Sequence, residues 1–220
     1  EEDIFKINGP LDLTFLSKFD KIEGFENLRK KNYTPQPAKY LKGSGNLFEQ
    51  IREHDILLHH PYETFEPVVN FVRQAAKDPD VLAIKQTLYR VSSNSPIIAS
   101  LAAAAENGKQ VTVLVELKAR FDEENNIEWS RRLEAAGCHV IYGLDDLKVH
   151  SKLCLITLKK QGKIEYITQI GTGNYNEKTA KLYTDLSLMT ANPDIGQEAS
   201  SVFQAIALGE VVDNVEHLMV

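Results

Sequence analysis

The sequence predicts an α/β sandwich, in which a mixed and largely parallel sheet is flanked by helices and an N-terminal extension comes first. Two observations favour this class. Strand-like and helix-like segments alternate between residues 55 and 143, and two strand-like segments then meet at a turn around Gly162. Alternation is typical of parallel sheets, and a tight turn is typical of antiparallel pairing. The 220 residues, 43% of them hydrophobic, are enough for one core plus an appendage.

The first part of the chain differs from the rest. Residues 1–41 carry Pro, Gly and charge without a sustained hydrophobic period. The stretch "YTPQP" predicts an extended linker, and "KGSGN" predicts a turn or hinge. We therefore expect residues 1–41 to be the tail of a preceding domain plus a linker, and residues 42–220 to form the main domain.

The elements of the main domain follow from local patterns. Strands are predicted within 55–63, 80–91, 110–120, 139–143 and 183–191, together with a hairpin within 149–174. Helical spacing marks 64–78, 95–109, 123–138 and 192–209, and residues 177–183 suggest one or two helical turns. The expected start and stop signals are Thr64, Asn107-Gly108, Asn192-Pro193 and Gly209.

Composition excludes several classes of protein. The net charge of −6 argues against a general nucleic-acid binder, although it leaves room for a local basic pocket. No apolar run is long enough to span a membrane, and no secretory pattern opens the chain. The two cysteines form neither a disulfide framework nor a metal pattern, so a cytoplasmic location is expected. The chain opens on Glu1 without Met, and we expect a piece of a longer protein.

Two arginines stand at equivalent places in the predicted sheet. Arg90 ends the strand within 80–91, and Arg120 ends the next strand along the chain. Carboxyl ends of neighbouring parallel strands share one rim, where ligands of such folds bind. Two guanidinium groups on that rim suit an anion with several oxygens. The alternative for each arginine is an ordinary surface charge.

A histidine and a lysine lie two residues apart in "LKVHSKLCLI". On a strand His150 and Lys152 would share one face, which is costly unless an anion sits between them. The alternative is a surface hairpin with polar ends. The turn "GTGN", which ends at Asn174, follows the next strand. His-x-Lys followed by Gly-x-x-Asn is the half-site pattern of the phospholipase D superfamily, in which the imidazole attacks phosphorus while lysine and amide hold phosphoryl oxygens.

Other polar or aromatic positions are open to two interpretations. Tyr183 lies at the expected start of the last strand, where an aromatic ring packs at an edge or stacks on a purine. Three histidines, His54, His59 and His60, lack partners at metal-ligand spacing, so we interpret them as structural, with the last two near the mouth of a pocket.

Longer strings resemble one family. "LLHHPYETFEPVVNFVRQAAKDPDVLAIKQTLYRV", "VELKARFDEENNI", "VHSKL" and "GTGNYNEKTAKLYTDLSL" are similar to the histidine-phosphorylating polyphosphate kinases of bacteria. The resemblance implies a phospholipase D-like fold for residues 42–220, the first of two such C-terminal catalytic domains. It implies that His150 is the phosphorylated histidine, that Arg90 and Arg120 form the phosphate and Mg²⁺ site, and that Tyr183 contacts ATP. Lys152 and Asn174 would assist at the phosphates.

The resemblance also implies partners and leaves alternatives. It implies Mg²⁺ as cofactor, ATP, ADP and polyphosphate as substrates, and a homo-oligomeric full-length protein. No specific nucleic acid is expected, and peripheral association with a membrane is left open. Thr157 replaces the acid of the phospholipase D pattern, and only one His-x-Lys is present, so this piece alone is expected to be inactive. The alternatives are a phospholipase D-like phosphodiesterase or nuclease completed by dimerisation, and a non-catalytic domain that binds polyphosphate or nucleotide.

Overall fold

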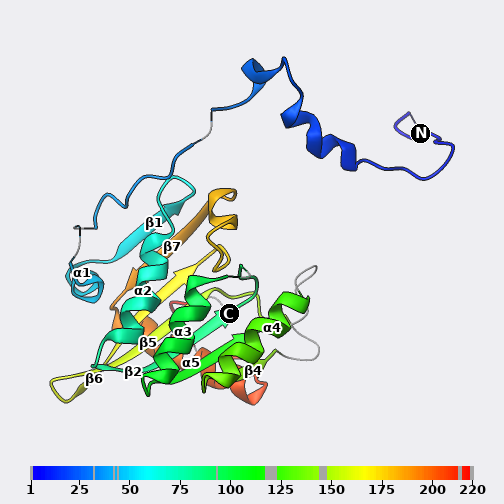
Figure 1. The fold of residues 1–220 in the computed structure, drawn as a ribbon. Coiled ribbons are helices and arrows are strands. Elements are labelled where there is room, and N and C mark those ends of the chain that lie inside the picture. The colour runs from blue at the N-terminus through cyan, green and yellow to red at the C-terminus, as the bar shows by residue number, and fades with distance from the viewer. Residues whose placement is uncertain are drawn as a thin grey trace. The chain divides into compact units, whose positions relative to one another are not determined.

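The computed structural model divides the chain into two units. It describes residues 2–31, 33–41, 43, 45–92, 94–116, 123–143, 148–212 and 215–218. Residues Glu1–Thr34 form one unit and Pro35–Val220 the other (Figure 1). The expected boundary at residues 41–42 stays a prediction.

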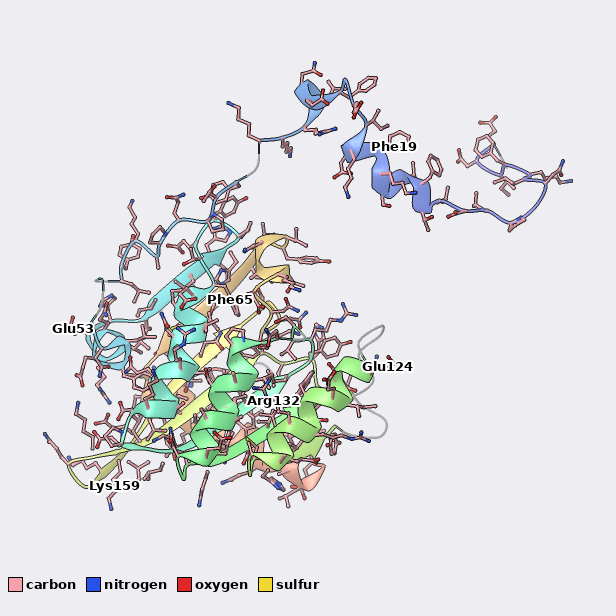
Figure 2. All side chains as sticks on the ribbon, viewed as in Figure 1. Phe19, Glu53, Phe65, Glu124, Arg132 and Lys159 are labelled. Atoms are coloured by element: carbon pink, nitrogen blue, oxygen red, sulfur yellow. The ribbon has the colours of Figure 1, made fainter. Side chains whose placement is uncertain are left out.

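The first unit holds two short 3₁₀ helices, η1 (Thr14–Lys21) and η2 (Glu26–Leu28). Neither helix buries a residue, and apolar side chains such as Phe15 and Phe19 are exposed (Figure 2 labels Phe19). The described part of this unit therefore has little core of its own.

The second unit is built on a seven-stranded sheet with the order β1-β7-β6-β5-β2-β3-β4. The strands are β1 (Ile56–His60), β2 (Val81–Leu88), β3 (Gln110–Val115), β4 (His139–Tyr142), β5 (Leu153–Lys160), β6 (Lys163–Gly171) and β7 (Asp185–Thr190). Strands β2, β3 and β4 pair in parallel, and the remaining neighbours pair antiparallel.

The mixed sheet is confirmed, but the expected predominance of parallel pairing is corrected. Only the β2-β3-β4 part has the predicted βαβαβ form among the described strands. The chain then returns through the β5-β6 hairpin, whose turn at Gln161 and Gly162 has positive φ at both residues, as a tight hairpin turn requires. Strand β1 does not join β2 but pairs with β7 at the far edge.

Helices cover both faces of the sheet. They are α1 (Leu47–Glu53), α2 (Glu66–Lys77), α3 (Pro96–Glu106), α4 (Glu123–Ala135) and α5 (Pro193–Leu208), with a 3₁₀ turn η3 (Thr179–Lys181) before β7. Figure 1 shows α2, α3 and α4 side by side over one face. The side chains of strand β5 alternate between the two faces of the sheet. Cys154 and Ile156 join the core under these helices, whereas Leu153 and Leu155 pack with α5 on the other face.

The helix ends agree with the sequence in part. Ser95 caps α3 and Asn192 caps α5 through side-chain oxygens, and Gly209 ends α5 in the left-handed region. Thr64 was predicted to cap the helix within 64–78, which is wrong, because this helix, α2, begins at Glu66 after Phe65. No described helix is long and apolar enough to cross a membrane. Cys138 and Cys154 are free and buried.

Candidate active site

The candidate site lies where the parallel and antiparallel parts of the sheet meet. Strand β2 ends at Leu88, Tyr89 and Arg90 follow it, and the antiparallel neighbour β5 begins at Leu153. The carboxyl end of β2 and the amino end of β5 are therefore at the same end of the sheet. This brings Arg90 and the His150–Lys152 segment together from distant parts of the sequence.

His150 and Lys152 precede the strand and are not part of it, which corrects the expectation of a shared strand face. His150 is exposed, whereas Lys152 is only 5% exposed. The ammonium of Lys152 donates a hydrogen bond to the backbone carbonyl oxygen of His150. The lysine is thus folded back under the residue that carries the imidazole.

The ring of Tyr89 lies against both His150 and Lys152. It meets the imidazole of His150 edge to face, with the ring centroids 4.9 Å apart. The ammonium of Lys152 lies 5.4 Å from the centroid of the same ring, and the guanidinium carbon of Arg90 lies 5.7 Å from it. Cations are attracted to the face of an aromatic ring, so Tyr89 helps to hold two positive groups near the imidazole. The sequence analysis did not identify Tyr89.

The charges at this place favour a neutral imidazole and a bound anion. Desolvation, and then the positive charges of Lys152, Arg90 and Lys148, lower the pKa of His150 below 6.5. Burial lowers the pKa of Lys152 to about 8, against the opposing effect of the Asp185 carboxylate. An unprotonated imidazole is a nucleophile, and the cations around it would offset the charge of a phosphate.

Hydrogen bonds fix the segment that carries His150. The hydroxyl of Thr87 donates to the carbonyl oxygen of Ser151 at 2.8 Å and accepts from the amide of Leu153 at 3.0 Å. On the other side, Oε2 of Glu116 accepts from the amide of Val149 at 3.3 Å. These contacts attach both flanks of the histidine to the ends of β2 and β3.

Asn126, at the start of α4, connects the same two strand ends. This side chain is completely buried, and its amide donates to the carbonyl oxygens of Tyr89 at 3.2 Å and Glu116 at 3.0 Å. Trp129 donates to the oxygen of Asn126 at 3.0 Å. These contacts could not be predicted from the sequence, because the three residues that Asn126 contacts meet it only in the folded chain.

The turn with Asn174 is shaped by close contact and not by left-handed backbone. Gly171 and Gly173 have no positive φ. A Cβ on Gly173 would instead lie 2.5 Å from Oδ2 of Asp185, so a side chain there would collide with that carboxylate. Oδ1 of Asp185 also accepts from the hydroxyl of Thr172 at 2.8 Å. The turn is therefore packed directly against the start of β7.

The remaining predicted site residues differ in burial, and one of them is not described by the structure. Asn174 is half-buried in this turn, and Tyr183 is 64% exposed just before β7, so its ring is open to a ligand. Arg120 lies outside the described residues. The roles predicted for all these residues stay predictions.

The side chains of the site determine how Mg²⁺ could be bound there. Among the described residues no group of three or more His, Cys, Asp or Glu side chains is placed to hold a metal ion. A guanidinium has no lone pair to donate, so Arg90 cannot ligate the ion itself. These residues fit an ion that is carried by phosphate oxygens, which the arginine would bind.

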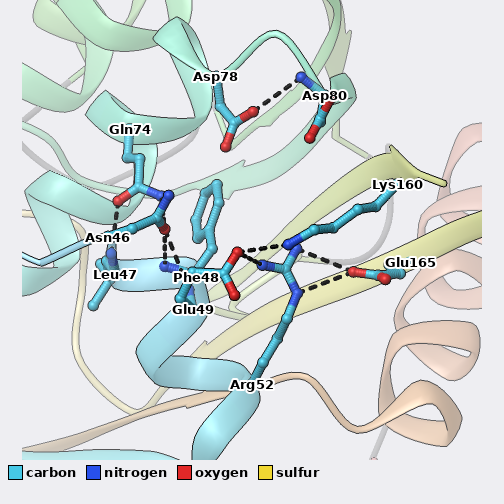
Figure 3. Close-up of polar contacts among 10 residues, drawn as sticks. All are labelled: Asn46, Leu47, Phe48, Glu49, Arg52, Gln74, Asp78, Asp80, Lys160 and Glu165. Atoms are coloured by element: carbon cyan, nitrogen blue, oxygen red, sulfur yellow. Dashed lines mark hydrogen bonds and ion pairs between the residues drawn. The ribbon is translucent and has the colours of Figure 1, made fainter.

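A cavity lies at the end of the sheet opposite the histidine site, near the start of β2 and the end of β5. Its volume is about 890 Å³, and its lining includes Asp80 before β2 and Lys160 at the end of β5. Figure 3 shows that charged groups there pair with one another: Glu49 accepts from Arg52 at 2.8 Å and from Lys160 at 2.6 Å. Glu165 also accepts from Arg52 at 3.0 Å. Because it lies at the other end of these strands, the cavity is separate from the histidine site.

Comparisons with known proteins find that this chain is similar in sequence to polyphosphate kinases. Residues 46–210 match the family model described as polyphosphate kinase C-terminal domain 1. Polyphosphate kinase of Bacillus cereus is 55% identical over an alignment of 222 positions, which covers 100% of this chain and 32% of the relative. That of Staphylococcus epidermidis is 55% identical over 94% of this chain and 28% of the relative. The chain thus spans about a third of the length of these curated relatives.

Solved structures give the same result. The crystal structure of polyphosphate kinase from Porphyromonas gingivalis matches with a TM-score of 0.73 and 42% identity, over 87% of this chain and 32% of that one. The phospholipase D family member Nuc from Salmonella typhimurium matches with a TM-score of 0.53 and 14% identity, over 74% of this chain and 99% of that one, which shows a shared fold. The chain belongs to the family of the first C-terminal domain of polyphosphate kinases.

Proposed function

We propose that this chain is a catalytic part of a polyphosphate kinase, which moves the terminal phosphoryl group of ATP to polyphosphate, reversibly, through a phosphohistidine at His150. The observation that carries this proposal is the imidazole surrounded by cations: desolvation and the charges of Lys152, Arg90 and Lys148 lower its pKa, which keeps it neutral and nucleophilic. The family of the chain supports the choice of ATP and polyphosphate as substrates.

The step forms one bond and breaks another. A ring nitrogen of His150 bonds to the γ-phosphorus while the bond from that phosphorus to the β,γ-bridging oxygen breaks, and ADP leaves with the bonding electrons. Arg90, Lys152 and the amide of Asn174 bind the phosphoryl oxygens, and Arg120 is proposed to join them. Arg90 would bind phosphate oxygens that carry Mg²⁺, and the ion would offset the negative charge of the nucleotide. Such transfers depend on positioning and electrostatics more than on covalent chemistry of the protein.

The terminal oxygen of a polyphosphate chain then takes the phosphoryl group from His150. The ring of Tyr183, which is exposed, is proposed to stack on the purine of the nucleotide. The rest of the full-length protein is proposed to complete the site, since this chain holds a single His-x-Lys. A cytoplasmic location, homo-oligomerisation and any peripheral association with a membrane stay predictions.

The test uses the full-length kinase that carries this sequence. With γ-labelled ATP and Mg²⁺ it should acquire an acid-labile, base-stable label, and His150→Ala should carry none. His54→Ala is the matched control, because His54 is exposed beyond α1 and outside the site. Label that persists on His150→Ala would overturn the proposal, whereas hydrolysis of a chromogenic phosphodiester without any label would favour a phosphodiesterase. The 220-residue chain alone should stay unlabelled.

A further inference from the structure

His60 is a buried histidine that the proposed mechanism does not use. It ends β1, opposite Asp185 of β7, and is only 3% exposed. Its ring packs against that of Phe65, with centroids 5.5 Å apart (Figure 2 labels Phe65). A polar side chain buried to this degree normally has a hydrogen-bond partner at each polar atom.

One ring nitrogen of His60 has a protein partner and the other has none. Nδ1 lies 3.0 Å from the carbonyl oxygen of Glu63, which can only accept. Nδ1 therefore carries the proton in the neutral ring, and Nε2 presents a lone pair. Nε2 is buried and has no hydrogen-bond partner among the described residues.

A second buried acceptor belongs to a residue that lines a small cavity together with His60. His60 and Asn174 both line a space of about 10 Å³ behind the "GTGN" turn, together with Gly173 and Asp185. Oδ1 of Asn174 is buried and also lacks a partner among the described residues. Two acceptors cannot bond to each other, so each needs a donor from a third group.

We propose that one buried water donates to Nε2 of His60 and to Oδ1 of Asn174, which makes His60 a positioning residue for Asn174. The cavity is close to the roughly 10–15 Å³ that one water requires, and a bound water needs at least two polar partners. The water holds the carbonyl oxygen of Asn174 inward. The amide NH₂ at the other end of the side chain then points outward, where it donates to a phosphoryl oxygen.

The first test looks for the contact itself, with the whole 220-residue chain. NMR of the histidine ring nitrogens should find Nδ1 of His60 protonated and Nε2 bare, and a high-resolution crystal structure should place a water between Nε2 and the Asn174 oxygen. His60→Phe removes the acceptor and keeps a flat ring, so it should shift the side-chain amide resonances of Asn174. His59→Phe, on the exposed face of the same strand, is the matched control and should leave them unchanged.

The first test separates this inference from the proposed function, because it measures no activity. A dry cavity, or a proton on Nε2, would overturn the inference even if the enzyme is a kinase. Asn174 resonances that do not respond to His60→Phe would do the same.

The second test rests on the proposed function and measures phosphohistidine formation in the full-length kinase. His60→Phe should slow the reaction about tenfold, as expected for the loss of one well-placed hydrogen bond. His60→Gln, which keeps an acceptor, should recover most of the rate. In an Asn174→Ala background His60→Phe should have no further effect.

Additive losses in that double variant would overturn the positioning role, because they would show that His60 acts through general packing. If Asn174→Ala leaves the rate unchanged, the role of Asn174 in the proposed function fails, and the NMR result still decides whether His60 orients it.

Discussion

At the scale of the residue, the site combines one imidazole, whose pKa is lowered, with several cations. His150 is exposed, Lys152 is buried beneath it, and Tyr89 lies against both. The sequence predicted a shared role for His150 and Lys152 from their spacing together with the "GTGN" turn, and this role stays a prediction. Tyr89 could not be predicted from its own strand, since an aromatic residue at that place is equally typical of packing.

The two shifted pKa values predict a bell-shaped pH dependence. Desolvation and nearby cations lower the pKa of His150 below 6.5, so its imidazole protonates only in more acidic solution, where the proposed attack would stop. Burial lowers the pKa of Lys152 to about 8, so its charge is lost as the pH rises through that value. The rate of phosphohistidine formation in the full-length kinase should rise across the first pKa and fall across the second.

Lys152→Arg is the control for the alkaline side, because arginine keeps its charge throughout this range. Its profile should lose the fall near the lysine pKa and keep the acidic limb. An unchanged alkaline limb would show that another group is responsible.

At the scale of the element, the sequence predicted strands and long helices better than caps and pairing. Asn192 precedes a proline, so the start of α5 was visible locally, whereas Ser95, which also precedes a proline and caps α3, was not predicted as a cap. Helix α1 was missed, because its seven residues are too few for a clear period and its cap Asn46 follows a Gly-rich stretch. The pairing of β1 with β7 was missed because no local pattern connects strands so far apart in the chain.

Helix α5 approaches β6 so closely that it depends on a glycine. A Cβ on Gly196 would lie 2.3 Å from Cβ of Tyr166, which is fixed to the backbone of the strand. Gly196→Ala should therefore push the helix outward and lower the free energy of unfolding by about 1–3 kcal/mol. Denaturant unfolding of the chain measures the change.

Ser201→Ala on the same helix is the control, and we expect it to change the free energy of unfolding by less than about 0.5 kcal/mol. Equal stability of Gly196→Ala and the parent chain would show that α5 tolerates a shift away from β6.

At the scale of the whole molecule, the end of the described chain returns to α5. Glu198 accepts from the amides of Glu216, His217 and Leu218, and from the ring Nδ1 of His217 at 2.8 Å. Leu218 also packs on the cluster beneath α5. Carboxylates that accept several hydrogen bonds stay ionised, and the pKa of Glu198 is lowered to about 2.

This attachment should depend on pH. The hydrogen bond to Glu198 raises the pKa of His217 above 6.5. The charged pair is therefore fully present below 6.5 and is lost as the pH rises through the raised value. Hydrogen exchange at the amides of residues 216–218 should accelerate over that range beyond the intrinsic rise with pH.

Glu198→Gln should return the pKa of His217 toward 6.5 and speed exchange at these amides at every pH. Glu210→Gln, just beyond α5, is the matched control and should change neither. Exchange in Glu198→Gln that matches the parent chain would show that packing alone holds this segment.

The pairing of β1 with β7 also bears on how the chain is made. During synthesis β1 is the first strand of the sheet to leave the ribosome, and Asp185–Thr190, its partner, is the last. Domains fold largely as units, so β1 has no partner strand until the residues up to β7 have been translated. His60 and Asp185 face each other across this final pairing, and the "GTGN" turn packs against Asp185. A nascent chain halted before β7 would therefore lack the carboxylate against which the turn with Asn174 packs, so the proposed phosphorylation site would be completed only after β7 has been translated.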